Sequence, residues 1–549
     1  MTNKEYADFL IPGITKEISD YEVMYKERDL ESNSIVTRYA PSPTGFVHMG
    51  ALFASFCERM MAKQSNGVFY LRIEDTDQKR SIENGISSIV RDLKNFNVEF
   101  DEGQISEDEY KGEYGPYIQS KREEIYKCFA KYLIEKDLAY PCFCTEENLN
   151  EIRENQEAIK ARIGYYGSYA RCRRLSKEEV IEKVKNGEKY IIRLKSPGNF
   201  NNKFVFDDCI KGKMELPEND LDIVIIKGDG LPTYHFAHLV DDHLMRTTHV
   251  IRGDEWLSSV PIHIQLFNIF GFKVPKYAHI APLMKEEDGN KRKLSKRKDK
   301  EAAVSYYHEQ GIPVYAVVLY LATVANSNFE AWYDNNKDKS YEEFKFDFKK
   351  MSTSGALFDL DKLMNISKNY ISRLKNTEVY DLALSWAIEY DKELYDLLVK
   401  YEDYSKLIFN IEREQNKPRK DIAAFSEVKS NIWYMFDELY FNKDKEYEYQ
   451  KINDKQEIKN ICLEYITKYY DINDDKDTWF NKLKELAYSF GYAKEVKEYK
   501  ENPDNYKGHV GDIATVLRVA LTSKSNTPDL YEIMKLLGKE RILNRFNLI

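Results

Sequence analysis

The sequence predicts a multidomain protein in which an α/β domain with a parallel sheet is interrupted by an α+β insertion and followed by all-α C-terminal domains. Three observations support this fold class. Residues 35–73 read as strand, loop, helix and strand, a succession typical of a parallel sheet. Strand patterns return at 221–226 and 249–252, after a mixed segment rich in Lys, Glu and Tyr. From about residue 303 the pattern is almost wholly helical. The first domain is therefore expected to be Rossmann-like.

Length and composition support several soluble domains. A chain of 549 residues is too long for one hydrophobic core. Hydrophobic residues make up 42% and charged residues 32%, which excludes a disordered chain. The uncharged stretch from Val314 to Ala325 is too short to span a bilayer, and Met1 to Leu10 lacks the apolar core of a secretory signal. We therefore expect a cytoplasmic protein that does not associate with membranes.

Charge and cysteine content narrow the choice of partners. The net charge of -10 excludes a global basic field, so any nucleic acid must be bound by local patches. Seven cysteines in so long a chain do not form a disulfide framework. Four of them stand far apart and are expected to be small buried hydrophobes: Cys57, Cys128, Cys209 and Cys462.

The elements of the first domain follow in order. Residues 1–34 form a polar extension without clear periodicity. A short strand at 35–39 leads into a loop whose proline and glycine content excludes regular structure. A helix over 50–64 is predicted by apolar residues at i, i+4 and i+8, and a second strand covers 68–73. Those apolar residues are Leu52, Phe56 and Met60.

The first functional candidate is the segment Arg38-Tyr-Ala-Pro-Ser-Pro-Thr-Gly-Phe-Val-His48-Met49-Gly50. It lies at the carboxyl end of a strand and opens a helix, where α/β sheets bind ligands and helix N–H groups attract anions. His48 would add a donor for phosphate, and Gly50 would let a nucleotide lie against the backbone. The alternative is a proline-rich loop whose histidine is only a helix cap.

The second candidate is Lys291-Arg-Lys-Leu-Ser-Lys-Arg-Lys-Asp-Lys300, with seven Lys or Arg in ten positions. Such a loop suits charge neutralisation on a polyphosphate in its transition state. The alternative is a solvated charge run or a targeting signal, against which the central Leu-Ser pair argues.

The third candidate is Arg72-Ile-Glu74-Asp75-Thr-Asp77, at the end of the second strand. Carboxylates crowded at this edge of the sheet suit an ammonium ligand or Mg²⁺. The alternative is an acidic loop that caps a helix, with Asp77 as the N-cap.

Together these segments resemble the class I aminoacyl-tRNA synthetases, and within them the bacterial-type enzymes of the glutamyl/glutaminyl subfamily. His48-Met-Gly-Ala51 and Lys293-Leu-Ser-Lys-Arg297 look like the two nucleotide-binding signatures of class I. The subfamily is further indicated by the two sheet-edge segments above, by Pro232-Thr-Tyr-His235 and by Val250-Ile-Arg-Gly-Asp-Glu-Trp256. The resemblance covers nearly the whole chain, because Leu517-Arg-Val-Ala-Leu-Thr522 and Leu537-Gly-Lys-Glu-Arg541 look like the family's C-terminal helical domain.

The resemblance implies a role for each matching residue. Expected at the glutamate are Arg38, Ala40, Ser42, Glu74, Tyr234, His238 and Arg252. Expected at ATP are His48, Gly50, Glu255, Trp256, Lys293 and Lys296, of which His48, Lys293 and Lys296 are the expected catalytic residues. Arginine suits a carboxylate and lysine a phosphate, which agrees with this division. For Arg38 the alternative is a structural ion pair with Asp75 or Asp77.

Two departures from the family pattern concern the same sites. Ala51 replaces the last histidine of the first signature, as small residues often do in this subfamily. His238 stands where many relatives have asparagine near the side-chain carboxylate.

Three cysteines in the insertion are similar to a zinc site that some of these enzymes carry: Cys142, Cys144 and Cys172. A structural zinc takes four ligands. Arg174 stands where a histidine would complete the set, and Tyr169 is a shifted candidate for the fourth ligand. The sequence leaves a zinc site and three unliganded thiols as equal alternatives.

The resemblance also implies the order and the roles of the domains along the chain. After the extension at 1–34, the expected parts are the first catalytic half (35–115), the acceptor-arm-binding insertion (116–221), the second catalytic half (222–290), the basic loop with a stem-contacting helical domain (291–375) and the helical anticodon-binding domain (376–549). A monomer is expected, with ATP and Mg²⁺ as cofactors and glutamate and tRNA(Glu) as substrates.

Four alternatives to a glutamyl enzyme specific for tRNA(Glu) follow from the same residues. A glutaminyl-tRNA synthetase usually ends in β-barrels, whereas this C-terminus reads as helical throughout. A truncated relative that glutamylates a tRNA base lacks the C-terminal domain. A catalytically inactive, RNA-binding paralogue is disfavoured by the residues present, namely Glu74, His48, Lys293 and Lys296. The fourth alternative, an enzyme that also charges tRNA(Gln), stays open.

Overall fold

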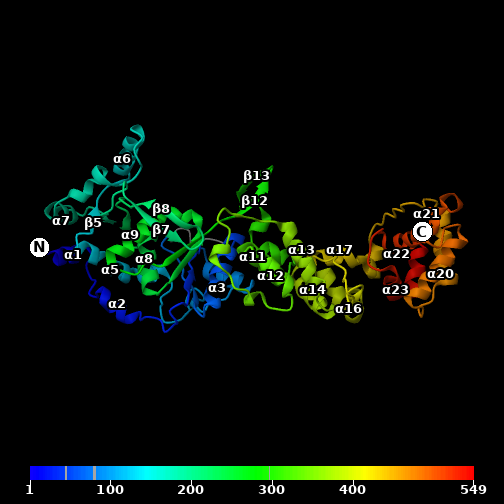
Figure 1. The fold of residues 1–549 in the computed structure, drawn as a ribbon. Coiled ribbons are helices and arrows are strands. Elements are labelled where there is room, and N and C mark those ends of the chain that lie inside the picture. Colours follow the sequence, from blue (N-terminus) through cyan, green and yellow to red (C-terminus); the bar gives the residue numbers. More distant parts are fainter. Residues whose placement is uncertain (44–45, 78–81, 296) are drawn as a thin grey trace. The chain divides into compact units, whose positions relative to one another are not determined.

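The computed structural model describes residues 1–43, 46–77, 82–295 and 297–549. It contains two compact units. Unit 1 comprises Met1–Tyr306 with Val318–Asp359, and unit 2 comprises Tyr307–Val317 with Leu360–Ile549 (Figure 1). The predicted fold class is confirmed, since an α/β domain with an α+β insertion precedes a C-terminal part built of helices.

The centre of unit 1 is the predicted parallel sheet. Strand β1 (Val36–Tyr39) leads through helix α3 (Met49–Gln64) to β2 (Val68–Leu71), which pairs in parallel with β1 so that Arg38 lies beside Tyr70. Helix α4 (Gly85–Lys94), the parallel strand β3 (Glu102–Gln104) and the antiparallel edge strand β4 (Tyr110–Lys111) complete this half. Because β1 and β2 are parallel, their carboxyl ends lie at the same edge of the sheet.

The second half of the domain returns to the same edge. Strand β10 (His249–Gly253) pairs in parallel with β11 (Lys276–Ile280), and the amide of Thr248 donates to the carbonyl of Val36, so β10 lies beside β1. Helices α8 (Tyr234–Leu244) and α9 (Val260–Phe270) flank these strands. The carboxyl ends of β1, β2, β10 and β11 therefore meet where α/β sheets bind ligands.

The insertion between the two halves is α+β, as predicted. Its helices are α5 (Glu123–Glu135), α6 (Glu146–Ala158) and α7 (Lys177–Lys185). Strands β5 (Ala139–Cys142), β6 (Ile191–Leu194) and β9 (Val224–Ile226) form an antiparallel sheet, and β7 (Lys203–Asp208) pairs with β8 (Gly212–Pro217) as a separate hairpin.

The first 34 residues contain two helices, contrary to the expectation of an extension without periodicity. Helix α1 (Asn3–Leu10) begins with a capping box at Thr2, and α2 (Ile18–Met24) follows. Tyr6 and Leu10 are buried in the core that they share with α5. The pattern was missed because each helix is only about two turns long, too short for helical periodicity to stand out.

The basic segment is partly a strand, which corrects the prediction of a loop over 291–300. Strand β12 (Leu283–Glu287) pairs antiparallel with β13 (Asn290–Lys293) through the two-residue turn Asp288-Gly289, whose φ angles are 51° and 77°. Positive φ at both positions is the geometry of a tight hairpin turn, which Asp-Gly favours. A short strand, β14 (Ala356–Leu357), pairs in parallel with β12 and interrupts the otherwise helical region after residue 303. Figure 1 shows the hairpin standing out from its unit.

The remaining elements are helical, with one large hydrophobic core in unit 2 that includes Leu394, Leu483 and Leu517. They are α10 (Ser305–Gln310), α11 (Val314–Ala325), α12 (Phe329–Asn335), α13 (Leu360–Ile371), α14 (Asn376–Tyr390), α15 (Lys392–Lys400), α16 (Glu402–Asn410), α17 (Val428–Ile432), α18 (Asp437–Asn442), α19 (Lys455–Glu464), α20 (Lys476–Ser489), α21 (Val496–Glu501), α22 (Val510–Thr522) and α23 (Leu530–Phe546).

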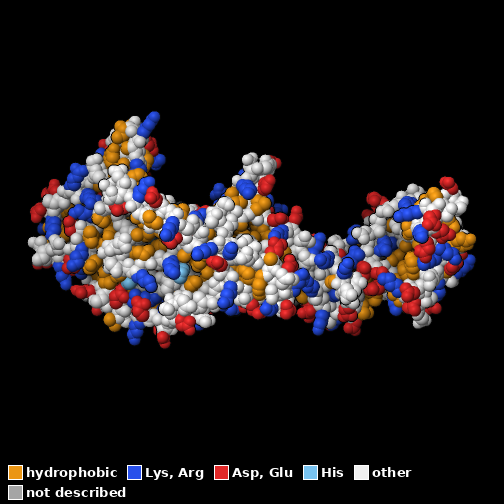
Figure 2. Space-filling view, in the orientation of Figure 1, with side chains coloured by type: hydrophobic (Ala, Val, Ile, Leu, Met, Phe, Trp, Pro, Cys, Tyr) orange, Lys and Arg blue, Asp and Glu red, His pale blue; other side chains and the backbone are white. Residues whose placement is uncertain are grey.

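The visible surface carries charged side chains of both signs (Figure 2). Lysine and arginine are interspersed with aspartate and glutamate over the face seen in Figure 2, without a field of one sign. Among the residues that the structure describes, no helix has the length and apolarity needed to cross a bilayer.

Candidate active site

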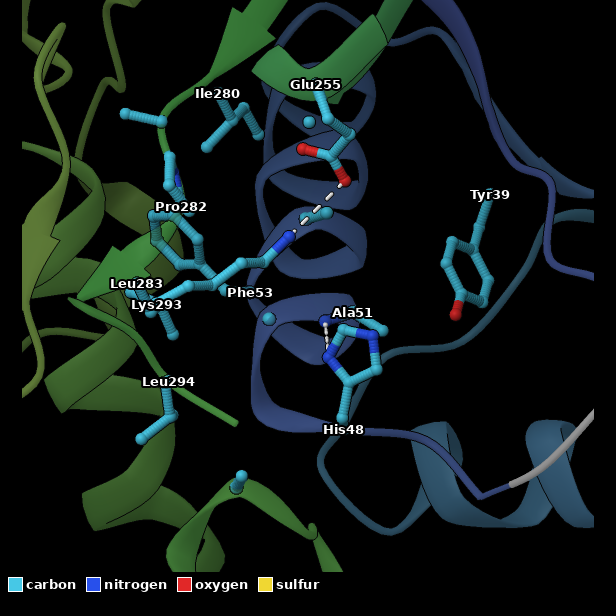
Figure 3. A pocket seen from close by; sticks show the side chains of 15 residues that line it. Tyr39, His48, Ala51, Phe53, Glu255, Ile280, Pro282, Leu283, Lys293 and Leu294 are labelled. Carbon is cyan, nitrogen blue, oxygen red and sulfur yellow. Dashed lines mark hydrogen bonds and ion pairs between the residues drawn. The ribbon is translucent and has the colours of Figure 1, made fainter. Parts of the chain in front are cut away.

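A cavity of about 410 Å³ opens at the carboxyl edge of the sheet, between the start of α3 and the β12–β13 hairpin (Figure 3). Its walls are mostly apolar, with a few polar groups from three distant segments. The lining residues are Tyr39, His48, Gly50, Ala51, Phe53, Ala54, Gly253, Glu255, Ile280, Ala281, Pro282, Leu283, Lys293, Leu294 and Ala302. Four of the six residues predicted at ATP therefore line one cavity, namely His48, Gly50, Glu255 and Lys293.

His48 is a helix cap, one of the two alternatives left by the sequence, and the cap uses only one of its two ring nitrogens. It is the N-cap of α3, and its Nδ1 accepts a hydrogen bond from the amide of Ala51 at 3.1 Å. Because Nδ1 accepts, the proton of the neutral ring lies on Nε2, which makes Nε2 the donor. A Cβ atom at Gly50 would lie 3.1 Å from that Nδ1, so glycine leaves room for the capping ring.

Lys293 reaches across the cavity from the end of β13. Its Nζ lies 3.6 Å from Oε1 of Glu255, and the two side chains are 61% and 53% exposed. Ion pairs this exposed contribute little to stability, so an incoming phosphate can replace Glu255 as the partner at small cost. Lys296, the second predicted lysine, lies outside the described residues.

Asp299, which sequence reasoning did not single out, anchors the basic segment. Its carboxylate accepts two hydrogen bonds from Arg292, at 2.7 and 2.8 Å, one from the Ser295 amide at 2.8 Å and one from Lys285 at 3.1 Å. The hydrogen bonds from Arg292 hold the pKa of Asp299 well below its usual value, although burial opposes them. Because its guanidinium is bound to Asp299, Arg292 stabilises the fold of the basic segment.

Arg38 is buried in β1 and bound to an aspartate. Its Nε and Nη2 donate to Asp242 on α8 at 3.0 and 3.4 Å. An ion pair with an acidic residue, the alternative considered from the sequence, is therefore present, but its partner is Asp242; Asp75 instead accepts from the amide and hydroxyl of Ser120. Burial alone would lower the pKa of Arg38, but the Asp242 carboxylate raises it above its usual value.

Asp242 is the centre of a buried charge cluster. It also accepts from Nη1 of Arg72 at 2.7 Å, and its Oδ2 lies 2.6 Å from Nδ1 of His238. Burial acts to raise the pKa of Asp242, yet Arg38 and Arg72 hold it well below its usual value. Glu74, predicted for the substrate ammonium, accepts from Nη2 of Arg72 at 3.0 Å. Burial raises the pKa of Glu74, with Arg72 opposing.

His238 is a fully buried link between Asp242 and Tyr277. Its Nε2 lies 3.0 Å from the hydroxyl of Tyr277, and its ring stacks on Tyr234 with centroids 6.0 Å apart. Burial lowers the pKa of His238 to about 3, so the ring is neutral at physiological pH. With Nδ1–H facing Asp242, Nε2 accepts from Tyr277.

Tyr234 and Arg252 meet at the start of α8 and the end of β10. Nη1 of Arg252 donates to the hydroxyl of Tyr234 at 3.1 Å, and Nη2 donates to the carbonyl of Trp256 at 3.2 Å. The ring of Tyr234 lies against that of Trp256, with centroids 4.4 Å apart. Burial raises the pKa of Tyr234, partly offset by Arg252. The predicted amino-acid and ATP residues thus adjoin at this stack.

Ala40 and Ser42 occupy the stretch that follows β1. Ala40 is half-buried and Ser42 is exposed. The carbonyl of the intervening Pro41 accepts from the amide of Glu74 at 2.9 Å, so the ends of β1 and β2 are held together there. The carbonyl of Pro43 likewise accepts from the amide of Ile82 at 3.0 Å.

The three cysteines of the insertion do come together. The Sγ atoms of Cys142, Cys144 and Cys172 all lie within 4.8 Å of one another. The hydroxyl of Tyr165, rather than that of Tyr169, accompanies them, 3.2 Å from Sγ of Cys144 and 3.6 Å from Sγ of Cys142. Tyr169 packs its ring against this cluster and against Tyr166. Arg174, the second position considered, donates to the carbonyl of Gly167.

The main residues that sequence reasoning missed lie on α8. Asp241 and Asp242 are fully buried, and Asp241 accepts from Nε of Arg122 at 2.7 Å. A usable signal was present, since Tyr234, His238 and Asp242 recur at intervals of four along a helix that also carries Phe236, Leu239, Val240 and Leu244. Polar residues at that spacing share one face, and on a buried helix such a face indicates a built polar site.

Comparison with known proteins matches both parts of the chain. Residues 34–365 match the family described as tRNA synthetases class I (E and Q), catalytic domain, and residues 393–549 match that described as anticodon binding domain. A "Glutamate--tRNA ligase" of Clostridium perfringens (strain SM101 / Type A) is 52% identical over 100% of this chain and 99% of its own length. A protein of the same description from Acetivibrio thermocellus is 48% identical over 99% of both chains.

A solved structure extends the match to the fold. The crystal structure of a glutamate tRNA ligase from Elizabethkingia meningosepticum CCUG26117, in complex with its amino acid, aligns with a TM-score of 0.75 and 26% identity. The alignment covers 94% of this chain and 99% of the other.

Proposed function

Since the chain belongs to the glutamate--tRNA ligases of the class I tRNA synthetases, we propose specific roles for its residues in that reaction. The enzyme activates glutamate with ATP to glutamyl-adenylate and pyrophosphate, and transfers the glutamyl group to the 3′ end of tRNA(Glu). The observation that carries the proposal is the meeting of two sets of residues at one sheet edge. One set suits a dicarboxylic amino acid and the other a nucleotide triphosphate.

Two arginines hold the two carboxylates of glutamate in this proposal. Arg252 binds the α-carboxylate, and Arg38 binds the side-chain carboxylate together with Tyr234, beside His238. Two of the five N–H groups of Arg38 donate to Asp242, so three remain for a ligand. Glu74 and Ser42 take the α-ammonium, and Ala40 provides backbone next to it. Support comes from Tyr234, whose hydroxyl accepts from Arg252 and whose pKa responds to the charges of Glu74 and Arg38.

ATP occupies the cavity between α3 and the hairpin in this proposal. His48 donates a hydrogen bond from Nε2 to a phosphate, and Gly50 and the amides at the start of α3 lie beside the phosphates. Trp256 and Glu255 border the nucleotide. Lys293 and Lys296 neutralise phosphate charge as the α-phosphorus is attacked, so catalysis rests on positioning and electrostatics. Support comes from the weak Lys293–Glu255 pair at the cavity, which phosphate can displace.

Mg²⁺ is proposed to arrive with the ATP phosphates rather than to occupy a cage of protein carboxylates. The carboxylates after β2 fit a cage poorly, since Glu74 is bound by Arg72 and Asp75 by Ser120. When bound, Mg²⁺ would neutralise phosphate charge.

Zinc is proposed for the cysteine cluster of the insertion. Three sulfur donors within 4.8 Å of one another suit a tetrahedral ion, and the nearby Tyr165 hydroxyl makes that residue the preferred fourth ligand in place of Tyr169. Its role would be structural, tying β5 to the segment around Cys172. Metal analysis of the purified protein tests this assignment.

The remaining parts are proposed to hold the tRNA. Residues 116–221 contact the acceptor arm, 291–375 the stem and 376–549 the anticodon, the last supported by the match of 393–549 to an anticodon binding domain. We propose a cytoplasmic monomer, in keeping with a substrate that translation consumes. Charging of tRNA(Gln) is the second candidate activity.

One experiment tests this assignment. Purified tRNA(Glu) and tRNA(Gln) are charged side by side with glutamate and with glutamine, and ATP–pyrophosphate exchange is measured with and without tRNA. We expect glutamate on tRNA(Glu), and little exchange without RNA, as the subfamily resemblance implies. Charging with glutamine would reject the substrate assignment, and glutamylation of tRNA(Gln) would establish a non-discriminating enzyme.

A further inference from the structure

Arg252 differs from the other arginines of the site in the chemistry of its partners. Arg38 and Arg72 are both bound to the carboxylate of Asp242. Arg252 is 6% exposed and, among the described parts of the chain, has no carboxylate within 4.0 Å. Its hydrogen-bond partners are neutral: the Tyr234 hydroxyl, the Trp256 carbonyl and two imidazoles.

The two imidazoles contact different nitrogens of the guanidinium. Nε of Arg252 donates to Nε2 of His279 at 3.1 Å, and Nη1 lies 3.2 Å from Nδ1 of His263. Burial lowers the pKa of both histidines, so both are neutral acceptors. A neutral acceptor orients a guanidinium without cancelling its charge. The full positive charge of Arg252 therefore stays available to an anionic ligand, in a buried place where it acts strongly.

An aspartate determines how His279 can serve Arg252. The guanidinium only donates, so Nε2 of His279 must be unprotonated and Nδ1 must hold the proton. Nδ1 lies 2.6 Å from Oδ2 of Asp208, and both side chains are fully buried. The Asp208 carboxylate thus fixes the tautomer that makes His279 an acceptor for Arg252.

Asp208 belongs to the insertion and not to the parallel sheet. It is the last residue of β7, and its Oδ1 accepts from the amides of Ile210 and Lys211 at 2.9 Å each, which closes the β7–β8 turn. The turn is attached to the sheet through the Cys209 amide, which donates to the Tyr277 carbonyl at 2.8 Å. Lys211 adds a bond to Asp254 at 3.2 Å, beside the nucleotide cavity.

We propose that Asp208 is a positioning residue for glutamate: through His279 it orients Arg252, so that the β7–β8 hairpin of the insertion sets the affinity of the amino-acid site. The inference rests on the proposed role of Arg252 at the substrate α-carboxylate. It adds a residue from outside the catalytic halves to the determinants of that affinity.

Asp208→Asn tests the tautomer directly, because the change in size is minimal. With the asparagine oxygen kept on the turn amides, its NH₂ faces His279 and favours the opposite tautomer. Nε2–H would then face Nε–H of Arg252, two donors in opposition. We expect KM for glutamate in aminoacylation to rise about tenfold to a hundredfold, the range for one lost hydrogen bond to a charged group. KM for ATP should stay within about twofold.

Asp207→Asn is the matched control. It makes the same substitution on the same strand, at an exposed position whose side chain lies on the other face. It should leave both KM values unchanged. An equal rise in KM for glutamate and for ATP in Asp208→Asn, or no rise in either, would overturn the proposal, because a purely structural role of the hairpin predicts no selective effect.

A double-mutant cycle identifies the route through His279. His279→Leu removes the acceptor of Arg252 while leaving the Asp208 turn bonds in place, and it repeats the test if Asp208→Asn folds poorly. In the His279→Leu background, Asp208→Asn should add no further increase in KM for glutamate. Additive effects would overturn the proposal.

Arg252→Gln separates this inference from the proposed function. If that variant raises KM for glutamate and Asp208→Asn does not, only the positioning role fails. If Arg252→Gln leaves KM for glutamate unchanged, the assignment of Arg252 to the substrate fails, and the role of Asp208 with it.

Discussion

The choice of glutamate over glutamine is predicted to depend on Arg38, and Arg38→Gln tests this. Glutamate and glutamine are nearly the same size, so charge must separate them. In the wild type, the three N–H groups that Asp242 does not use face the substrate side chain in our proposal. A carboxylate accepts them, whereas a glutamine amide turns its own donor toward the cation.

The structure allows an estimate of the effect. Loss of charged hydrogen bonds in a closed site costs about 2–5 kcal/mol, or about 30- to 5000-fold in kcat/KM for glutamate. The fold should survive, since Asp242 keeps Arg72 at 2.7 Å, Thr247 at 3.0 Å and His238 at 2.6 Å. The ratio of kcat/KM for glutamate to that for glutamine should shrink, because a glutamine at position 38 can both donate and accept.

The assay measures activation of both amino acids with tRNA present, alongside thermal unfolding of each variant. Arg28→Gln is the matched control, because Arg28 is a similarly buried arginine that donates to Glu102 through Nη1 and Nη2. It should lose stability and keep the glutamate preference. If folded Arg38→Gln loses both substrates equally, Arg38 is a scaffold residue and the reasoning is refuted.

Four further outcomes are expected. Lys293→Ala should lower kcat by about 10²-fold with little change in KM for glutamate, since the contact forms with phosphate in the transition state, and near-normal single-turnover adenylate formation would contradict this. Cys172→Ser should abolish zinc retained after gel filtration, while zinc that is absent from the wild type would reject the site. Glu58 is buried, and its Oε2 has no hydrogen-bond partner among the residues that the structure describes. Burial raises the pKa of Glu58 well above the usual value, so the native state holds a proton that the unfolded state releases above about pH 4.3. Stability should therefore fall as pH rises from there, and Glu58→Gln should be more stable than the wild type at pH 8 by about 1–3 kcal/mol but not at pH 4, whereas an unchanged unfolding midpoint at pH 8 would refute this. The affinity for tRNA should fall steeply with salt, because bound phosphates release counterions, and a salt-independent Kd would place the RNA contacts elsewhere.

Local patterns predicted the parts of the fold that have their own periodicity. The strand–helix–strand succession ending at residue 73 was found because β-formers alternate with an apolar helical stripe and glycine ends the helix. The two helices at the N-terminus were not predicted, because their stability comes from packing on α5, more than a hundred residues away. The β12–β13 hairpin was obscured by its lysines, although Asp288-Gly289 carried the turn signal.

In the site, the sequence predicted individual residues but not the residues that they contact. Motif residues such as His48 and Lys293 could be named from the sequence, and they line one cavity. Their partners could not, because an ion pair such as Arg38–Asp242 joins positions 204 residues apart. The choice of Tyr165 over Tyr169 likewise depends on how the chain turns between Cys144 and Cys172, which residue spacing leaves undetermined.

The contacts of the N-terminal helices have a consequence for how the protein assembles during synthesis. The carboxylate of Glu22 accepts from Arg246 at 2.7 Å across 224 residues, and from His243 across 221. At about 5–20 residues per second, the ribosome takes roughly 10–45 s to deliver those partners. Helices α1 and α2 can pack on α5 once residue 135 has been made, but the bonds that join Glu22 to α8 and to Arg246 form only later. Helix α2 therefore completes these contacts only after α8 has been synthesised, although the two helices are far apart in the sequence.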